Sequence, residues 1–155
     1  MVGAEESDRF LLCSIGSSFC ALSLRDVREV MRPLPVEPLG GMPSFMLGLA
    51  IVRGIATPVI DAGRLLGATA LTSPSRFVSL KLGERSAALA VDAVFDIRAI
   101  ATEILADIPP LLRQARADLV SAVGALDAKL LLVLEAARVV PESIWGVIDA
   151  PGPLA

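Results

Sequence analysis

The chain has 155 residues, of which 54% are hydrophobic, and it carries a formal net charge of −3 without any histidine or tyrosine. The missing histidines exclude a Ser-His-Asp triad and a histidine metal site, and the acidity with few aromatic side chains disfavours nucleic-acid binding. No uncharged stretch exceeds 15 residues, and one of that length, Pro38–Val52, contains three glycines and two prolines and is too short to cross a bilayer. We expect a cytoplasmic protein that binds no metal or cofactor and does not insert into membranes.

An internal duplication divides the chain into two copies. Residues 9–30 align with residues 76–97 at an offset of 67 positions, with six identities among 22 aligned pairs. Residues 52–66 align with residues 126–140 at an offset of 74, so the second copy carries seven extra residues between the two blocks. Positions where the copies agree are expected to form the framework, and positions where they differ are candidates for function.

The duplication predicts one domain, residues 9–140, made of two repeat units at residues 9–67 and 76–140. Units of this size bury too little apolar surface to be stable alone, so each unit should pack on the other. Residues 141–155 are predicted as a tail with a frayed end. One amphipathic turn of this tail is expected to dock through three apolar side chains: Ile144, Trp145 and Val147.

Short apolar segments, punctuated by glycine, proline or charges, predict strands rather than long helices. In chain order, the first hairpin pairs Phe10–Ile15 with Phe19–Leu24 around Gly16, and it recurs 67 residues later around Gly83. Glycine supplies the positive φ that a tight turn needs, which explains why both copies keep it. Each hairpin leads through a turn into an extended segment, at Arg25–Val30 and Asp92–Ile97.

The next segment, residues 31–45, holds four of the eleven prolines and predicts a surface loop. Leu47–Val52 and Ile55–Ile60 then predict a strand pair around the Arg53-Gly54 turn. Asp61 is expected to cap a short helix that Gly67 ends, and its counterpart Glu135 is a poorer cap.

Two connecting segments complete the predicted fold. Ala68–Ser75 is expected to link the copies, and Thr102–Val120 is expected to be a loop with a helical turn on each side of a proline pair. Many short strands in two copies predict an all-β protein of two small barrels packed together.

Candidate catalytic groups are scarce. Cys13 and Cys20 correspond to Leu80 and Ala87 in the second copy, which favours small apolar core residues over a disulfide or metal ligands. The sequence contains no nucleophile elbow, phosphate loop, dinucleotide fingerprint or Cys-x-x-Cys pair. Because the acidic residues are repeat-related rather than convergent, we expect no enzymatic activity.

Charged and apolar residues near the turns leave two interpretations open. Arg53 lies in an otherwise uncharged stretch and must reach solvent, a carboxylate or a partner protein, or else serve as an ordinary turn residue. Val27 and Val94 agree between the copies and favour the core, although an acid two residues later also fits a protein-binding rim.

Several motifs follow one another in a fixed order along nearly the whole chain. In chain order the motifs are ALSLRDVREV, a proline-rich loop, RG-x-x-x-PV-x-D followed after three residues by LLG, and A-L-x-V-D-x-V-x-D-I. This ordered set resembles the CheW-type coupling proteins of bacterial chemotaxis, and the similarity runs from about Arg9 to Val140. The resemblance implies two intertwined five-stranded β-barrels of the SH3-like or OB-like kind. It further implies a non-catalytic adaptor, monomeric in isolation, that joins the cytoplasmic tip of methyl-accepting chemoreceptors to the regulatory domain of a CheA-type histidine kinase.

The resemblance also assigns roles to individual residues. On the receptor side, three apolar residues would supply contact area and a charged pair would set the orientation: Val27, Val94 and Ile97, with Glu29 and Arg53. Ile55, on the strand after Arg53, would face the kinase.

Two departures from the family pattern, Ala50-Ile51-Val52 before the Arg-Gly pair and Ala62 after P-V-x-D, keep a divergent adaptor of a parallel pathway open. Surface motility is one such pathway, and this homologue would bind the kinase without receptors. A small OB-type barrel that binds a ligand or single-stranded nucleic acid is the alternative from another class.

Overall fold

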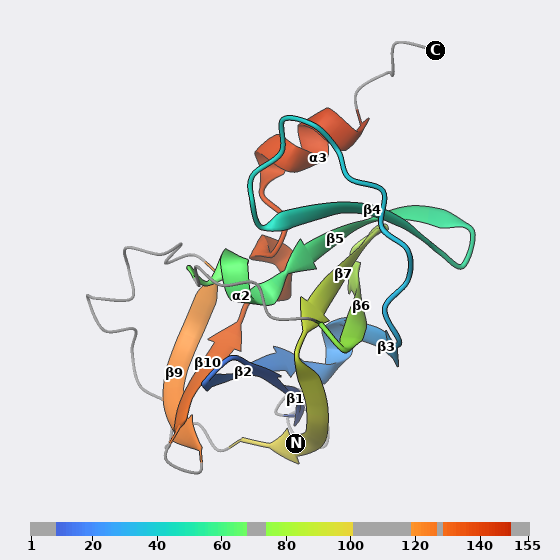
Figure 1. Ribbon diagram of the computed structural model, residues 1–155. Coiled ribbons are helices and arrows are strands. Elements are labelled where there is room, and N and C mark those ends of the chain that lie inside the picture. The colour runs from blue at the N-terminus through green and yellow to red at the C-terminus, as the bar shows by residue number, and fades with distance from the viewer. Residues whose placement is uncertain (1–8, 68–73, 101–118, 127–128, 150–155) are drawn as a thin grey trace.

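A computed structural model describes residues 9–67, 74–100, 119–126 and 129–149 (Figure 1). Nearly all of the connecting segments predicted at Ala68–Ser75 and Thr102–Val120, and the end of the tail, lie outside these described residues. In the described ranges, no helix has the length and apolar character needed to span a membrane.

Two five-stranded sheets form the fold, with sheet B in the upper half of Figure 1 and sheet A in the lower half. In spatial order, sheet A contains β8 (Ala93–Ala99), β1 (Arg9–Ile15), β2 (Ser18–Ser23), β10 (Lys129–Leu134) and β9 (Val120–Leu126). Sheet B contains β3 (Val27–Met31), β6 (Arg76–Leu82), β7 (Arg85–Val91), β5 (Ile55–Asp61) and β4 (Met46–Val52). The helical elements are η1 (Leu24–Asp26), α2 (Ala62–Leu65), η4 (Ala136–Arg138) and α3 (Glu142–Asp149). The all-β prediction with short helical elements is confirmed.

The two copies exchange their hairpins, so the predicted intertwining is confirmed. The β1–β2 hairpin of the first copy pairs in parallel with β10 of the second, and the β6–β7 hairpin pairs in parallel with β5 of the first. Both hairpins turn at the expected glycines, Gly16 with φ 58° and Gly83 with φ 69°. Replacing each strand by its repeat counterpart converts the order of sheet A into that of sheet B.

The expected closed barrels are wrong, because the hydrogen-bonded order of each sheet ends at two edge strands. In sheet B, the outer edge of β4 pairs with the proline-rich loop instead of with β3. The Glu37 N–H donates to the Leu49 carbonyl at 2.8 Å, and the Leu49 N–H donates to the Glu37 carbonyl at 2.9 Å. Prolines on both sides of Glu37 lack an N–H group, so the loop covers this edge without extending the ladder.

Apolar residues on both faces of the central strands build three cores. The main core lies between the sheets and includes Leu22 of sheet A and its counterpart Leu89 of sheet B. A second core, around Phe77, lies on the face of sheet B that points away from the main core. A third core, around Leu12, lies on the corresponding face of sheet A. Burial on both faces explains why β7 reads as a nearly continuous apolar run.

The two cysteines are core residues, as their repeat counterparts predict. Cys13 and Cys20 lie opposite each other on β1 and β2, are fully buried and are not joined by a disulfide. Burial and the hydrogen bond to Cys13 raise the pKa of the Cys20 thiol, with the hydrogen bond as the larger cause. Both side chains therefore pack as small apolar groups.

The helix caps agree with the prediction from the sequence, and the docking of the tail agrees with it only in part. The Asp61 carboxylate accepts a hydrogen bond from the Arg64 N–H at 3.2 Å, whereas Glu135 makes no such side-chain bond before η4. In α3, Ile144 and Trp145 are buried in the main core as predicted. Val147 is 58% exposed, contrary to prediction, because it lies on the side of the helix opposite Trp145, and Ile148 packs against the main core instead.

Candidate functional site

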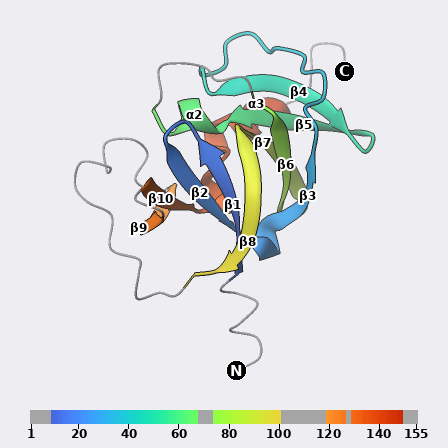
Figure 2. The ribbon, with the colours of Figure 1, turned by 60° about the horizontal axis from the view of Figure 1, so that its bottom comes forward.

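The edge strands β3 and β8 lie on the same side of the molecule, where β8 occupies the front of Figure 2 and β3 stands to its right. Each strand carries a β-bulge at the same repeat position, which leaves Arg28 of β3 and Phe95 of β8 without a partner in register. Bulges bend edge strands and redirect their side chains, and they are enriched beside functional sites. The duplicated bulge makes these two strands the leading candidates for a binding surface.

Four β-branched side chains share one face of these strands because of the bulges. Each lies opposite a residue of the main core: Val27 opposite Leu80, Val30 opposite Val78, Val94 opposite Cys13, and Ile97 opposite Leu11. Val27 and Val94 are half-buried against that core, whereas Val30 is 40% exposed and Ile97 is 51% exposed. We call these four residues the edge-strand surface.

Arg53 and Glu29 form a bidentate ion pair next to this surface. The Arg53 Nε lies 2.5 Å from Glu29 Oε2, and Arg53 Nη2 lies 2.8 Å from Glu29 Oε1. The pair joins the β4–β5 turn to β3 across sheet B. Because the Arg53 side chain is 76% exposed, the pair contributes little to stability, and its main effect is to orient the guanidinium and the carboxylate.

The conformation of the β4–β5 turn is a second indication that Arg53 belongs to a functional site. Both central residues have positive φ, 49° at Arg53 and 81° at Gly54, as in the type I′ turns that usually take Asn-Gly. Arg53 is the one described residue other than glycine with positive φ. A bulky side chain at such a position costs about 1 kcal/mol and is typical of functional sites.

We expect the ion pair to control the titration of Glu29. The hydrogen bond from Arg53 lowers the pKa of Glu29, so the pair stabilises the fold at pH values above the pKa of the unfolded carboxyl and is lost as the pH falls through the folded pKa. Arg53→Gln should raise the pKa of Glu29 back toward its usual range in a carboxyl-detected NMR titration. Its repeat counterpart Asp96 is the internal control, because Arg98 independently lowers the pKa of Asp96. An unchanged Glu29 pKa in the variant would contradict the pairing.

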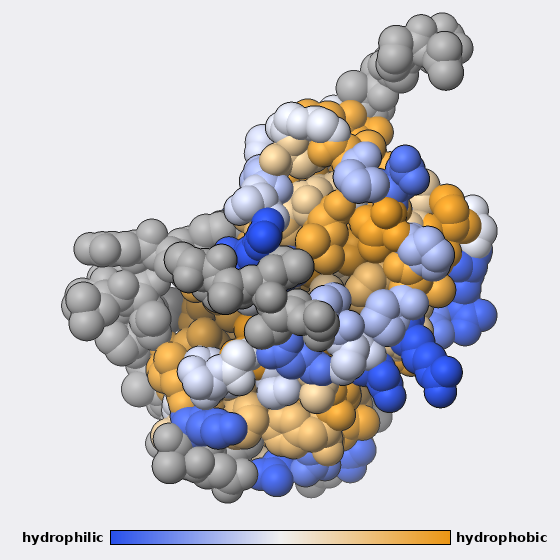
Figure 3. Space-filling model, viewed as in Figure 1, coloured by the Kyte–Doolittle hydropathy of each residue, from blue (hydrophilic) through white to orange (hydrophobic). Residues whose placement is uncertain are grey.

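Exposed apolar residues flank the same turn. Ile55, predicted to face the kinase, is 58% exposed, and Ile51 is 64% exposed on the neighbouring strand. Apolar side chains gather over the upper half of the face in Figure 3, where Figure 1 shows β4 and the loop before it. Exposed apolar side chains at the tip of a hairpin are suited to binding another protein rather than to catalysing a reaction.

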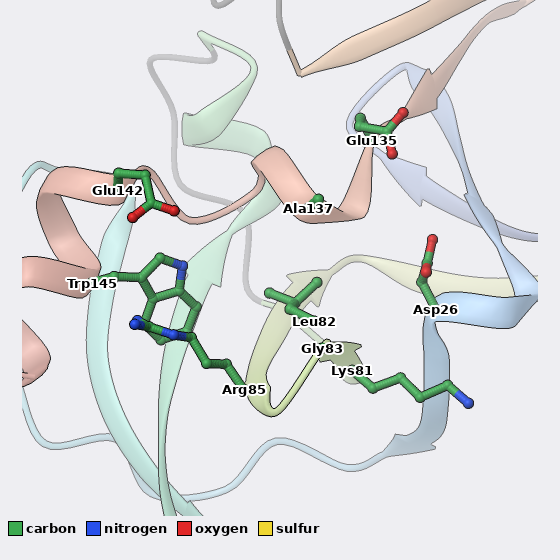
Figure 4. A pocket seen from close by; sticks show the side chains of 9 residues that line it. All are labelled: Asp26, Lys81, Leu82, Gly83, Arg85, Glu135, Ala137, Glu142 and Trp145. Atoms are coloured by element: carbon green, nitrogen blue, oxygen red, sulfur yellow. The ribbon is translucent and has the colours of Figure 1, made fainter.

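A pocket of about 320 Å³ opens between the β6–β7 turn and α3 (Figure 4). The guanidinium carbon of Arg85 lies 4.6 Å from the Trp145 ring centroid at one side of it. Three carboxylates and two cations line it, so its chemistry selects no class of ligand. It is lined by Asp26, Lys81, Leu82, Gly83, Arg85, Glu135, Ala137, Glu142 and Trp145. This set includes none of the receptor-side or kinase-side residues predicted from the sequence.

One family profile covers most of the chain. The profile of the CheW-like domain matches residues 9–143. The chain belongs to the CheW-like family. Proteins of this family are non-catalytic scaffolds, and this chain is a CheW-type adaptor protein of chemotaxis.

Individual CheW proteins match over nearly their whole length. The probable chemotaxis protein CheW of Rhizobium etli is 26% identical over 84% of this chain and 86% of that protein. The chemotaxis protein CheW of Klebsiella aerogenes is 20% identical over 96% of this chain and 91% of that protein. The crystal structure of the scaffolding protein CheW from Thermoanaerobacter tengcongensis matches with a TM-score of 0.73 at 23% identity, covering 83% of this chain and 84% of that chain, and shows the same fold.

In this CheW-like chain, sequence reasoning missed Val30 of the edge-strand surface, the bulge residue Phe95 and the exposed Ile51 of β4. Val30 is the repeat counterpart of Ile97, so the duplication already contained the signal for it. Phe95, whose ring centroid lies 4.8 Å from that of Phe19, replaces Arg28 of the first copy. Ile51 lacked a signal, because its exposure depends on β4 being an edge strand. The functional roles of the predicted residues stay predictions.

Proposed function

We propose that this CheW-like protein couples methyl-accepting chemoreceptors to a CheA-type histidine kinase in the cytoplasm. The observation that carries the proposal is the edge-strand surface. Its four apolar side chains lie on one face of the bulged strands β3 and β8, beside the Glu29–Arg53 pair. Apolar side chains provide contact area for a helical hairpin, and an oriented ion pair fixes its register. Ile55, on the separate hairpin tip, is the proposed kinase contact.

Substituting an exposed residue of the edge-strand surface tests the receptor contact. Ile97→Asp places an unpaired charge where an apolar contact is proposed and should weaken binding of a purified receptor hairpin fragment roughly 30-fold or more. Isothermal titration calorimetry with a chemoreceptor tip fragment from the same cell measures this. Val147→Asp is the matched control, because Val147 is equally apolar and 58% exposed on α3.

The same titration separates the proposed adaptor from a kinase-only homologue. The Ile97→Asp variant should retain full binding of the kinase regulatory domain, since Ile97 lies in sheet A and Ile55 lies in sheet B. A wild-type chain that binds the kinase domain but no receptor fragment would overturn receptor coupling and favour the kinase-only homologue. Equal loss in the Ile97→Asp and Val147→Asp variants would refute the edge-strand surface as the contact.

A further inference from the structure

Three arginines follow the first edge strand and its approach: Arg25 in η1, Arg28 at the bulge of β3, and Arg32 just after β3. We call them the arginine strip. All three are exposed, and within the described residues their guanidinium groups form no hydrogen bond or ion pair. In contrast, the guanidinium groups of Arg53 and Arg98 each bind a carboxylate. The strip is thus a cationic surface that no described residue neutralises, on a chain whose net charge is −3.

The second copy shows that the fold does not require these cations. The counterparts of the strip, 67 positions later, are Asp92, Phe95 and Ala99. Asp92 has a structural contact, because its Oδ2 accepts a hydrogen bond from the Gly16 N–H at 2.6 Å. The same positions in the first copy carry guanidinium groups that bind no other described residue. Differences of this kind between repeats mark function rather than framework.

The position of the strip ties it to the edge-strand surface. Arg28 is the bulge residue between Val27 and Val30, and Arg32 follows Val30 by two positions, the spacing at which an extended chain returns to the same face. A partner that covers these valines therefore comes within reach of these guanidinium groups. Glu29 does not neutralise the strip, since both of its carboxylate oxygens are bonded to Arg53. Of the two acids in residues 25–32, Asp26 is then the one that binds no cation among the described residues. The local surface is cationic, in contrast to the chain as a whole.

We propose that the arginine strip recognises carboxylate side chains on the partner that binds the edge-strand surface. This proposal rests on the proposed function, because it takes that partner to be the receptor hairpin. Guanidinium groups bind carboxylates in bidentate geometry and speed the encounter of oppositely charged surfaces. An anionic membrane or a nucleic acid is a weaker match, because the apolar valines interrupt the strip and the net charge of −3 repels a polyanion. The acidic residues should flank the apolar contact of the hairpin.

Neutralising the strip tests this specificity. The triple substitution Arg25→Gln, Arg28→Gln and Arg32→Gln should weaken binding of a receptor hairpin fragment by about tenfold at low salt, as expected for three exposed ion pairs. The affinity of the wild type should fall as salt is raised from 50 to about 300 mM, and that of the triple variant should change less. Lys129→Gln is the matched control, because it removes one exposed cation from sheet A and should leave binding unchanged.

The titration, a vesicle-binding assay and a charge-swap experiment together decide whether the strip binds receptor carboxylates. If the triple variant binds the receptor fragment as tightly as the wild type and with the same salt dependence, the strip does not recognise the receptor. The proposed function would then still stand. No receptor binding by the wild type would overturn the proposed function itself. Arg-dependent binding to phosphatidylserine vesicles, without an effect of the triple substitution on receptor affinity, would overturn a protein partner in favour of a membrane surface. Restored affinity on pairing Arg28→Glu with an acid-to-Lys receptor variant would support the proposal.

Discussion

Replacing Ile55 by aspartate is expected to lower the affinity for the kinase regulatory domain roughly 30-fold or more, with the folded structure unchanged. Ile55 is 58% exposed and follows the two-residue turn at Arg53-Gly54, so its side chain is free to insert into a partner. An aspartate there would have to lose its hydration inside an apolar interface without a counter-charge. Isothermal titration calorimetry against the purified regulatory domain measures the change.

Two controls define what the Ile55→Asp result means. Val147→Asp alters an equally exposed apolar residue on α3 and should bind the kinase domain like the wild type. The Ile55→Asp variant should still bind the receptor hairpin fragment, because the edge-strand surface lies on other strands. Unchanged kinase affinity in Ile55→Asp would place the kinase contact elsewhere on the molecule and refute the hairpin tip.

Replacing Gly48 by alanine is expected to destabilise the protein by about 2–4 kcal/mol, from backbone strain and two weakened hydrogen bonds. Gly48 has φ 143° at the irregular start of β4, and a Cβ atom there would overlap the carbonyl group of Glu37. The collision would push the proline-rich loop from the outer edge of β4. Urea unfolding should show the loss, and hydrogen exchange should show reduced protection of the Leu49 amide.

Gly40→Ala is the matched control for this substitution. Gly40 lies in the same proline-rich loop, and a Cβ atom added there would meet no other atom within 4 Å. This variant should be as stable as the wild type or slightly more stable, because alanine restricts the unfolded chain. Equal unfolding free energies for Gly48→Ala and the wild type would show that the loop shifts freely and does not seal the edge of β4.

Local features of this fold were predictable because short-range chemistry determines them. Gly16 and Gly83 occupy turns that demand positive φ, and Asp61 caps α2 with its own carboxylate. The duplication added long-range information, since Cys13 could be placed in the core from its counterpart Leu80. These inferences needed no knowledge of which strands become neighbours.

Features that depend on strand neighbours could not be predicted in the same way. The sheets were expected to close, but Glu37 pairs with Leu49 and occupies the edge that closure requires. The bulges that place Val30 and Ile97 on one face follow from register, which periodicity alone does not reveal. The contact of Glu29 with Arg53 was inferred from the family resemblance, since 24 positions separate the two residues.

The exchange of hairpins between copies sets the order in which the sheets can be completed during synthesis. Every strand of sheet B has left the ribosome once the chain has emerged to Val91, whereas sheet A also needs β10, which ends at Leu134. The β1–β2 hairpin is made first, yet its parallel partner is made last. Until then the nascent chain exposes the apolar residues of this hairpin, such as Leu22, and it is most prone to aggregation at this stage. A ribosome that stalls between the copies therefore leaves both sheets incomplete.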